Sequence, residues 1–463
     1  MINLYLKDIA LILNAKLIGN NCKINSISID SRKIFNKKNC LFIAIKGKKF
    51  NGECFIKESI KNGAVAVINA RKVNINIPHL IVKNTIISLL RLSKWIRENS
   101  KAKIIAITGS SGKTSVKEII FNILNTFSNT IATKKNFNNN IGVPLTLLRL
   151  NKNHNFAIIE VGGNKFGEIK TSSNLIKPDI ALINNISESH LSGFKSINGV
   201  SKAKEEIFSG IQGKKNGIIV LNYNSNDWKE WKKKLKDNLV FWFGIIKNKK
   251  KYFYLKNIKK ENFCIKFSIS TQKEECEVSL PLIGYHNLFN AMAAIAISFL
   301  VGASMESIKY GLKKSYPFKR RLFPIFLNKN KIIIDDSYNA NVGSMISAIS
   351  VLNNMPGYKI IIIGDILELG KQKEIIIHKN IGFFISKSKI NKVFSIGYLS
   401  YFSSIFSKKG KHFYNIDYLI SETIKMISRY PIITVLIKGS NKTDAYNIVK
   451  MLQESARHAS MVM

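Results

Sequence analysis

Long apolar runs alternate with segments of helical periodicity along most of the chain. In the middle, strands are predicted at "KIIAIT", "NFAIIEV" and "DIALINN", with a long helix after the first strand and another over residues 197–211. Strands that are apolar on both faces are typical of a parallel sheet covered by helices on both sides. The alternation restarts with "KIIIDD", "KIIIIGD", "KVFSIG" and "ITVLIKG", which predicts a second sheet of the doubly wound, Rossmann-like type.

The remaining segments complete an α/β fold of three domains. Short apolar strands, "CLFIAI" and "AVAVIN", flank a helical stretch near residues 53–61, which indicates a small α/β unit at the start of the chain. Residues 241–282 alternate like antiparallel strands, and a buried helix is expected after Asn287. With roughly 150 residues per domain as a guide, we expect domains at residues 1–83, 84–314 and 315–463.

The composition adds a strong positive charge without identifying a partner. The 463 residues include 72 Lys and Arg against 29 Asp and Glu, a formal net charge of +43, which by itself favours nucleic acid or an anionic membrane. The excess is mostly Lys, is spread over the whole length and accompanies many Ile and Asn residues, as codons of an A+T-rich genome produce. We therefore expect no nucleic-acid partner.

One basic segment keeps an alternative function open. Over residues 247–263, "KNKKKYFYLKNIKKENF", lysines alternate with aromatic residues as in a single-strand binding surface. A basic nucleic-acid-binding ATPase would use this segment. A solvated strand pair with half-buried aromatic residues is the simpler interpretation, and we favour it.

The sequence predicts a cytoplasmic protein that does not insert into a membrane. The N-terminal "MINLYLKDIALILNAKLIG" has charges within its apolar run and no small-residue cleavage site, so we interpret it as an amphipathic helix and not as a signal peptide. The longest apolar stretch, residues 291–301, is too short to span a bilayer. The five cysteines lack CxxC and metal-site spacings, which fits reduced thiols. We also expect a monomer.

The segment "AITGSSGKTS" is the first candidate for chemistry. A buried strand runs into Gly109 and Gly112, and Lys113, Thr114 and a helix follow. This order directs backbone N–H groups and a helix N-terminus at a phosphate, with the lysine on the terminal phosphates and the threonine hydroxyl on magnesium. The first glycine of the general pattern is replaced by Ile107. A nucleotide phosphate site is the favoured interpretation, and a plain glycine turn is the alternative.

Other polar residues are predicted at the same edge of the central sheet. Glu160 ends the strand in "IIEVGGN", and His190 follows the next strand in "NNISESHLSGF". The helix containing "VSKAKEEIF" adds Lys202 and Lys204. The carboxyl ends of parallel strands are where ligands bind in such sheets. Each residue also has an ordinary structural interpretation, namely a strand-end carboxylate or a solvated helix face.

A series of motifs then resembles, in order and spacing, the motifs of the Mur ligase family. They are "TGSSGKT", "NFNNNIGVPLTLL", "EVGGN", "NNISESHLSGF", "KAKEEIF", "GYHNLFNAMAA", "RLFPI", "DDSYNANVGSM", "GDILELG" and "KGS". The resemblance covers essentially the whole chain. It implies an ATP-dependent ligase that joins D-alanyl-D-alanine to UDP-N-acetylmuramoyl-tripeptide through an acyl phosphate, with ATP as cosubstrate and Mg²⁺.

Two related activities are alternatives. The sister Mur ligase that adds the third residue, a diamino acid, has a signature that resembles "DNPR", which this sequence lacks, whereas "DDSYNAN" favours the dipeptide-adding member. Folylpolyglutamate synthase resembles the last two domains only and lacks the N-terminal uridine-binding domain.

The resemblance assigns roles around the phosphate loop. It implies that Lys113 holds the β and γ phosphates, that Arg321 lies near the γ phosphate, and that Asn287 and Asn290 contact the adenine side. An N-cap on the buried helix is the structural alternative for these two asparagines. The residues implied to contact ATP are Thr108, Gly109, Ser110, Ser111, Gly112, Lys113, Thr114, Ser115, Asn287, Asn290 and Asp336.

The resemblance also implies a magnesium site. Thr114 and Glu160 would hold one ion, and His190 would help to hold a second. Lys204, at the family spacing from the histidine, resembles the lysine that becomes carbamylated and bridges the ions. An ammonium group cannot bind a cation, whereas a carbamate offers the oxygen ligands that magnesium prefers. The implied catalytic group is Lys113, His190, Lys204 and Arg321.

The substrate residues follow by resemblance as well. Ser31 and Arg32 in "SIDSRKI" match the uridine diphosphate site, although the segment also fits a surface turn. The other implied contacts to the nucleotide sugar or the incoming amine are Asn136, Asn139, Tyr338, Asn339, Asn341, Lys438 and Ser440. Because three substrates must meet in one cleft, we predict that closure of the three domains assembles the site.

The sequence departs from the family pattern near the site for the amine. Arg320 stands where a glycine is usual, before Arg321. After "KGS" the family commonly continues with Arg, but this chain has Asn441, and Ala445 and Tyr446 stand where Met and Glu are frequent. These departures predict altered contacts to the amine substrate.

Overall fold

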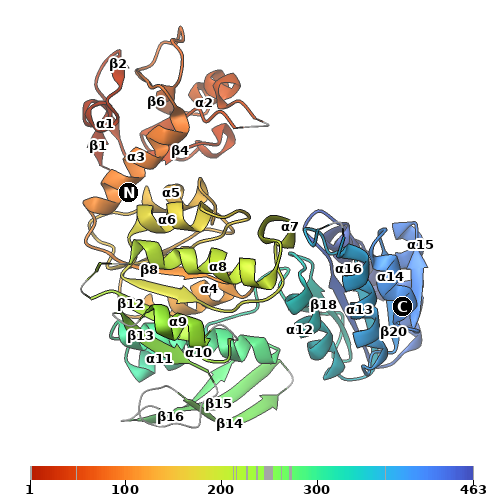
Figure 1. Cartoon of the computed structure of the whole chain (residues 1–463). Coiled ribbons are helices and arrows are strands. Elements are labelled where there is room, and N and C mark those ends of the chain that lie inside the picture. Colours follow the sequence, from red (N-terminus) through yellow and green to blue (C-terminus); the bar gives the residue numbers. More distant parts are fainter. Residues whose placement is uncertain are drawn as a thin grey trace.

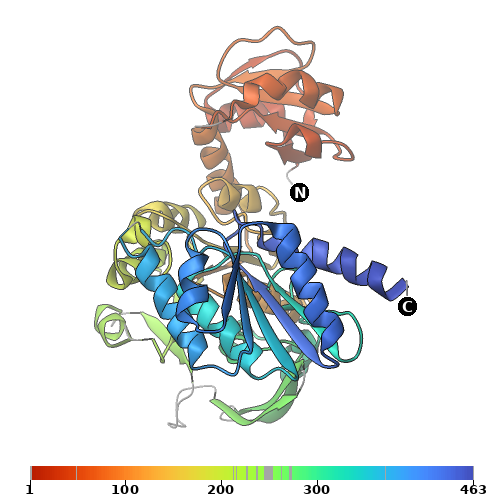
Figure 2. The same ribbon diagram turned by 90° about the vertical axis from the view of Figure 1, so that its right-hand side faces the viewer.

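The structure, a computed structural model, describes residues 3–47, 50–211, 213–214, 216–225, 228–235, 238–244, 254–261, 263–270, 274–370 and 372–461. Figure 1 shows three parts: the first, red to orange, stands above the central part, and the blue C-terminal part lies beside the central part. After a quarter turn the C-terminal part lies in front of the central one (Figure 2). The chain is an α/β protein with several parallel sheets, as the sequence predicts.

The first part contains a five-stranded sheet and a small two-stranded sheet. The larger one has the order β2 (Lys16–Ile18), β7 (His79–Ile81), β6 (Ala64–Asn69), β5 (Cys40–Ile43) and β4 (Ser26–Ser28). The smaller pairs β1 (Leu4–Tyr5) with β3 (Lys23–Ile24). The helices are α1 (Leu6–Leu13) and α2 (Ile56–Lys61), with short 3₁₀ turns η1 (Ser31–Lys33) and η2 (Gly52–Phe55). The amphipathic N-terminal helix and both predicted strands are confirmed.

Helix α3 (Thr85–Glu98) connects the first part to the central part. Asn84 caps the N-terminus of this helix, because its side-chain Oδ1 accepts hydrogen bonds from two N–H groups of the first turn. Leu89, Leu92 and Ile96 on its buried face belong to one apolar cluster that also includes Leu6 of the first part and residues of the central sheet. The helix therefore packs against both parts.

The central part is built on a six-stranded parallel sheet. Its order is β13 (Leu239–Phe243), β12 (Ile218–Asn222), β11 (Ile180–Ile183), β8 (Lys103–Thr108), β10 (Phe156–Glu160) and β9 (Thr130–Ala132). An antiparallel sheet follows, with β14 (Tyr254–Glu261), β15 (Cys264–Ser270) and β16 (Glu275–Leu280). The helices are α4 (Lys113–Leu124), α5 (Gly142–Leu147), α6 (Glu168–Ile176), α7 (Leu191–Phe194), α8 (Ile197–Glu205), η3 (Glu206–Gly210), α9 (Trp228–Lys234), α10 (Tyr285–Leu300) and α11 (Met305–Lys313).

Two sequence predictions in this region need comment. Residues 241–243 were expected in antiparallel strands, but they lie in β13, which pairs in parallel with β12. Alternation alone cannot tell which neighbour a strand pairs with, since pairing is set by the long crossover connection. Of the basic segment 247–263, residues 247–253 and 262 lie outside the described residues, and part of the rest forms β14.

The C-terminal part has a second six-stranded sheet. Its order is β17 (Phe323–Phe326), β18 (Lys331–Asp336), β22 (Ile433–Lys438), β19 (Tyr358–Ile363), β20 (Lys392–Ile396) and β21 (Gly410–Phe413). Only β17 is antiparallel to its neighbour. The helices are α12 (Val342–Asn353), α13 (Glu374–Ser386), α14 (Ser400–Phe406), α15 (Ile416–Arg429) and α16 (Ala445–Met461). The four predicted strands are confirmed, and the edge strands β17 and β21 were not predicted.

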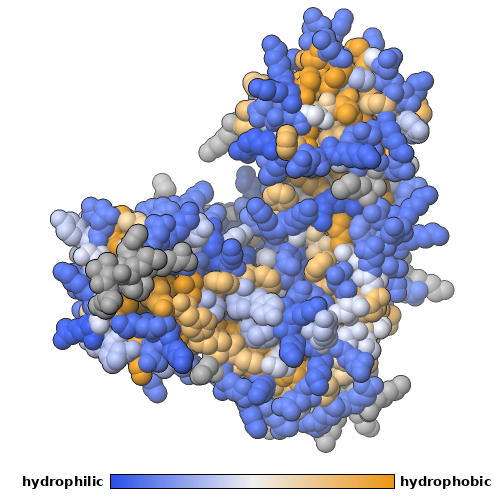
Figure 3. All heavy atoms as spheres, turned by 180° about the vertical axis from the view of Figure 1, so that it is seen from behind, coloured by the Kyte–Doolittle hydropathy of each residue, from blue (hydrophilic) through white to orange (hydrophobic). Residues whose placement is uncertain are grey.

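The carboxyl ends of the two large sheets open into one cleft. Residues that follow β8, β10 and β11 line the same pocket as residues that follow β18 and β19. Helix α7 packs with Leu191 and Phe194 into an apolar cluster of the C-terminal part. From behind, hydrophilic side chains cover most of the surface, and a wide notch separates the first part from the C-terminal part (Figure 3). Among the described residues, no helix has the length and apolar character needed to cross a bilayer.

Candidate active site

The phosphate loop joins β8 to α4. Gly109 and Gly112 have φ values of 147° and 75°, in the region that side chains rarely adopt. A Cβ atom on Gly112 would lie 2.3 Å from Oδ1 of Asn290, so a side chain there would displace the asparagine. Lys113 begins α4, and its Nζ turns back over the loop to donate to the Gly109 carbonyl at 2.5 Å. The helix has no side-chain cap, which leaves N–H groups of its first turn to bind an anion.

The segment that follows β11 holds this loop in place. Ser110 Oγ donates to the Ser187 carbonyl at 2.9 Å, and the Ser111 N–H donates to Asn185 Oδ1 at 2.9 Å. Asn184 Nδ2 donates to the Ser111 carbonyl at 3.1 Å. The shape of the loop is therefore fixed by two neighbouring strands of the sheet.

Asn287 and Asn290 lie inside α10 and support the same loop. Asn290 Oδ1 accepts from Asn184 Nδ2 at 2.8 Å, and Asn290 Nδ2 donates to Asn287 Oδ1 at 3.0 Å. Asn287 Nδ2 donates to the Ile283 carbonyl at 2.8 Å. The N-cap of α10 is Gly284. The alternative interpretation of these asparagines as N-caps is therefore wrong.

Thr114 and Glu160 form the oxygen-rich side of the pocket. Thr114 Oγ1 donates to Glu160 Oε2 at 2.9 Å, while Asn138 Nδ2 donates to Glu160 Oε1 at 2.8 Å. Arg321 Nη2 of the C-terminal part donates to Thr114 Oγ1 at 3.1 Å. Glu160 is only 2% exposed and lies at the end of β10, where the sequence placed it. Hydroxyl and carboxylate oxygens are suitable ligands for Mg²⁺.

Lys204 is buried in this pocket and not on a solvated helix face. It is 1% exposed, and burial, followed by the charge of Lys113, lowers its pKa to about 7. Its Nζ lies 5.3 Å from the centre of the Phe194 ring. In the part of the chain that the structure describes, no hydrogen bond or ion pair engages this amine. An amine with such a pKa is about half neutral near pH 7, and the neutral form can act as a nucleophile.

His190 connects the central part to the C-terminal part. Its Nδ1 lies 2.6 Å from Oε2 of Glu368, which follows β19. This contact with His190 is the main cause that lowers the pKa of Glu368. The Ser192 N–H donates to the Glu368 carbonyl at 3.2 Å. Glu368 was not predicted as a site residue, although "GDILELG" follows a buried strand at the ligand-binding edge.

The C-terminal part supplies the opposite wall. Lys438 Nζ donates to Asp336 Oδ2 at 2.6 Å and to the Asn339 carbonyl at 3.0 Å. The Arg321 guanidinium lies 4.0 Å from the centre of the Tyr338 ring. Asn341 caps α12, because its Oδ1 accepts from the Ser344 N–H at 2.8 Å.

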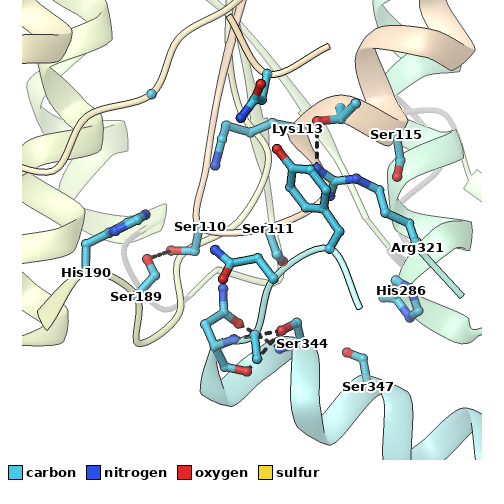
Figure 4. Close-up of a pocket in the computed structure, with 18 of the residues that line it drawn as sticks. Ser110, Ser111, Lys113, Ser115, Ser189, His190, His286, Arg321, Ser344 and Ser347 are labelled. Atoms are coloured by element: carbon cyan, nitrogen blue, oxygen red, sulfur yellow. Dashed lines mark hydrogen bonds between the residues drawn. The ribbon is translucent and has the colours of Figure 1, made fainter. Parts of the chain in front are cut away.

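These residues surround one cavity of ≈ 320 Å³ between the two parts. Figure 4 shows Ser110, Ser111 and Lys113 on one side of it, with Ser344 and Ser347 on the facing helix α12. The predicted site residues that the structure brings together here are Ser110, Ser111, Gly112, Lys113, Thr114, Ser115, Asn136, Glu160, His190, Lys204, Asn287, Asn290, Arg321, Asp336, Tyr338, Asn339, Asn341 and Lys438.

Six predicted residues do not line this cavity. Thr108 ends β8 and Gly109 begins the loop, and Asn139 Oδ1 accepts from the N–H of Gly142, the first residue of α5, at 2.9 Å. Ser440 Oγ accepts from the Leu367 N–H at 2.9 Å, so it supports the segment that contains Glu368. Ser31 and Arg32 lie in η1 of the first part, and their roles stay predictions.

Sequence reasoning missed several pocket residues. Asn138 stands between two predicted asparagines, and His286 precedes the predicted Asn287, so both could have been found from neighbouring positions. The main residues missed are Asn138, Ser189, His286, Ser344, Ser347 and Glu368.

Two family models match the chain. "Mur ligase family, catalytic domain" covers residues 23–106, and "Mur ligase middle domain" covers residues 107–298. The second match begins within β8 and includes the phosphate loop, Glu160, His190 and Lys204.

Curated relatives match along the whole chain. A UDP-N-acetylmuramoyl-tripeptide–D-alanyl-D-alanine ligase from Buchnera aphidicola subsp. Acyrthosiphon pisum is 45% identical, with 99% of this chain and 100% of the relative covered. The ligase of the same name from Escherichia coli K12 is 40% identical, with coverage of 98% and 99%.

Solved structures agree with the fold. A crystal structure of MurF from Acinetobacter baumannii superposes with a TM-score of 0.90 at 30% identity and covers 98% of this chain and 99% of that one. MurF from Thermotoga maritima in complex with ADP has a TM-score of 0.80 at 24% identity, covers 94% and 98%, and supports the fold alone. On the family models and the full-length relatives together, the chain belongs to the Mur ligase family.

Proposed function

We propose that the chain is an ATP-dependent ligase that joins D-alanyl-D-alanine to UDP-N-acetylmuramoyl-tripeptide, giving the pentapeptide of peptidoglycan synthesis, ADP and phosphate. The observation that carries the proposal is the joint pocket, in which a phosphate loop faces residues of the C-terminal sheet. The names and identities of the full-length relatives support the choice of substrates. A phosphate loop alone would fit many nucleotide-binding proteins.

The phosphate loop binds ATP. The glycine backbone and the free N–H groups at the start of α4 surround the phosphates. When ATP binds, Lys113 Nζ gives up its hydrogen bond to the Gly109 carbonyl and binds the β and γ phosphates. Burial lowers the pKa of Lys113, and Glu160 opposes that shift. The negative charge of a bound triphosphate would, like that of Glu160, favour the charged form of the Lys113 amine.

The donor set of the pocket fits Mg²⁺. Within the described residues, no three His, Cys, Asp or Glu side chains lie close enough to hold a metal ion. Thr114 and Glu160 offer oxygen atoms, His190 offers Nε2, and Lys204 becomes a ligand when its neutral amine adds to CO₂ and loses a proton, which gives a carbamate. The lowered pKa of Lys204 and the lack of a hydrogen bond or ion pair to its amine among the described residues support this step. Bound magnesium would neutralise phosphate charge as an electrophile.

The chain then positions reactants and neutralises charge. A carboxylate oxygen of the tripeptide attacks the γ phosphorus of ATP, the bond to ADP breaks, and an acyl phosphate forms. The amine of the dipeptide attacks the acyl carbon, loses a proton, and phosphate leaves with the carboxylate oxygen. Lys113 and Arg321 stabilise the negative charge that gathers when one anion approaches another. No covalent intermediate with the enzyme is needed.

The three parts divide the substrates. The first part, with Ser31 and Arg32, together with Asn136 and Asn139, binds the nucleotide sugar. The central part binds ATP, and the C-terminal part, with Lys438 and Ser440 among its residues, binds the dipeptide. The enzyme acts as a monomer in the cytoplasm. Its five cysteines are free, which suits a reducing compartment.

Phosphate release from ATP tests the proposal. The purified protein is supplied with ATP, UDP-N-acetylmuramoyl-tripeptide and D-alanyl-D-alanine, and each is omitted in turn. Release that requires all three, with the pentapeptide seen by mass spectrometry, is the expected result. Release that ignores both peptides, or that requires a free diamino acid in place of the dipeptide, would overturn the proposal. Release driven by single-stranded DNA would instead favour the nucleic-acid-binding alternative.

A further inference from the structure

Two consecutive arginines, Arg320 and Arg321, share the Tyr338 ring but reach different partners. Their guanidinium carbons lie 5.9 Å and 4.0 Å from the centre of that ring, which places them no more than about 10 Å apart. Arg321 reaches Thr114 beside the phosphate loop. Arg320 reaches Asn441 in the loop after β22. One positive group thus lies at the end of the phosphate loop, and the other lies against the loop after β22.

The side chain of Arg320 is held by four contacts. Its Nε donates to Ser337 Oγ at 3.3 Å, and its Nη2 donates to the Ser337 carbonyl at 2.8 Å and to Asn441 Oδ1 at 3.2 Å. The guanidinium carbon also lies 4.2 Å from the centre of the Tyr446 ring. A half-exposed arginine is usually free to move, but these contacts fix the guanidinium in one place.

The positive charge of Arg320 has no carboxylate partner in the described ranges of the chain. No acidic oxygen there lies within 4.0 Å of it, and no hydrogen bond uses its Nη1, although a guanidinium has five N–H donors. The nearby Asp335 carboxylate accepts two bonds from Ser337 instead, at 2.6 Å and 3.0 Å. Arg320 therefore retains donors and charge for an anion.

The backbone of Arg320 favours a different residue. Its φ is 68°, in the left-handed region that costs a non-glycine residue free energy. Its carbonyl accepts from the Tyr338 N–H at 3.0 Å, so the wall of the pocket depends on this conformation. Glycine would adopt it without strain. The arginine at this position therefore keeps its side-chain contacts at a cost in backbone free energy.

We propose that Arg320 binds the carboxylate of the incoming dipeptide, an inference that rests on the proposed ligase function. The amine of the dipeptide must meet the acyl phosphate, on the side of Arg321. An extended dipeptide spans roughly 7 Å, which is within the upper limit of about 10 Å on the separation of the two guanidinium groups. Lys438 suits the carboxylate less well, because its charge is already neutralised by Asp336 at 2.6 Å. A planar guanidinium also matches the two oxygens of a carboxylate.

The test compares D-alanyl-D-alanine with its C-terminal amide in wild type, Arg320→Gly and Arg320→Lys. Glycine suits the backbone at this position, so the variant removes the side chain without adding strain. We expect Arg320→Gly to lower kcat/KM for the acid by about 10- to 100-fold, mainly through KM, and to leave the amide and the KM for ATP nearly unchanged. Arg320→Lys keeps the positive charge and should therefore recover part of the kcat/KM for the acid that Arg320→Gly loses. Lys319→Ala, an exposed neighbour, should behave as wild type.

An equal loss for acid and amide, or no loss for either, would overturn the inference. Should the glycine variant melt well below wild type, Arg320→Gln is judged by the same acid-to-amide ratio. A wild-type enzyme that makes no pentapeptide from either dipeptide would overturn the proposed function itself. The two results can be told apart. The inference about Arg320 fails when product forms without the expected difference between acid and amide, whereas the proposed function fails when no product forms.

Discussion

Nδ1 of His190 and Oε2 of Glu368 lie 2.6 Å apart, across the boundary between the central and C-terminal parts. Within the residues that the structure describes, no Lys or Arg forms an ion pair with an Asp or Glu across this boundary. Because Glu368 engages Nδ1, Nε2 is the ring nitrogen left for a metal ion, as in carboxylate–histidine–metal arrangements. The orientation of a residue in the central part thus depends on the position of the C-terminal part.

Removing Glu368 should weaken the metal site without touching the phosphate loop. We expect Glu368→Ala to lower the affinity for Mn²⁺ about 10-fold or more, measured by electron paramagnetic resonance in the presence of ADP. Small-angle scattering should show a larger radius of gyration, since one of the contacts that join the two parts is lost. Glu306→Gln, on the exposed side of α11, is the charge-matched control. Unchanged Mn²⁺ affinity in Glu368→Ala would contradict this role.

Lys204 should carry a carbamate. Protein equilibrated with ¹³C-bicarbonate and magnesium is expected to show one carbamate carbon signal by NMR, because the lowered pKa leaves a large neutral fraction of the buried amine near pH 7. The signal should be absent from Lys204→Met. Lys202→Met serves as the control, since Lys202 lies two residues away on the same helix and is exposed. A signal that survives in Lys204→Met would place the carbamate elsewhere.

A side chain at Gly112 should abolish nucleotide binding. The Cβ atom of Gly112→Ala would lie 2.3 Å from Asn290 Oδ1 and 2.7 Å from Asn184 Nδ2, so these two side chains must be displaced, and the loop that Asn184 holds is expected to shift with them. We expect ATP affinity to fall at least about 100-fold, because the phosphate-binding N–H groups move with the loop. Gly302→Ala separates strain from the clash, since Gly302 also has positive φ, 97°, but has nothing within 4 Å of its Cβ position. Similar losses in both variants would contradict the explanation.

We expect the protein to lose stability at acidic pH because His286 becomes protonated on unfolding. Burial, followed by the charge of Lys438, lowers the pKa of His286 to about 4. The pKa of this histidine is about 4 in the folded state and near 6.5 in the unfolded state. Between these two pH values the unfolded state binds more protons than the folded state, so the stability present above about pH 6.5 is lost as the pH falls toward about 4. We expect this histidine to account for roughly 2 to 3 kcal/mol of that loss.

Chemical denaturation of wild type and His286→Gln across pH 4 to 8 measures this effect. The difference between the two free energies of unfolding should be constant above about pH 7 and shrink below it. A difference that does not vary with pH would show that His286 is not the group responsible.

The parts of the site formed along one strand and the loop after it could be predicted from the sequence. The phosphate loop from Gly109 to Gly112 and the position of Glu160 follow from apolar runs that end in polar residues. The burial of Lys204 could not be derived from its own segment, because a lysine on a short helix fits a solvated face equally well. Only the resemblance to a family singled it out.

The contacts that join distant parts of the chain could not be predicted. Glu368 meets His190 although 178 residues separate them, and no periodicity relates two loops that belong to different sheets. Ser440 Oγ accepts from the backbone of Leu367, a contact that its own segment does not indicate, and its contact with substrate stays a prediction. The partners of Arg320 likewise come from two distant stretches of the chain, after β18 and after β22, so its departure from the family pattern gained a meaning only in the structure.

The central claim is that an oxygen atom of the tripeptide carboxylate passes to phosphate when the dipeptide is joined. The most direct measurement uses UDP-N-acetylmuramoyl-tripeptide labelled with ¹⁸O in that carboxylate, together with ATP and D-alanyl-D-alanine, and determines the mass of the released phosphate and of the peptide product. The account predicts one ¹⁸O atom in each phosphate and a pentapeptide that retains the other. Unlabelled phosphate, or release without pentapeptide, would contradict it.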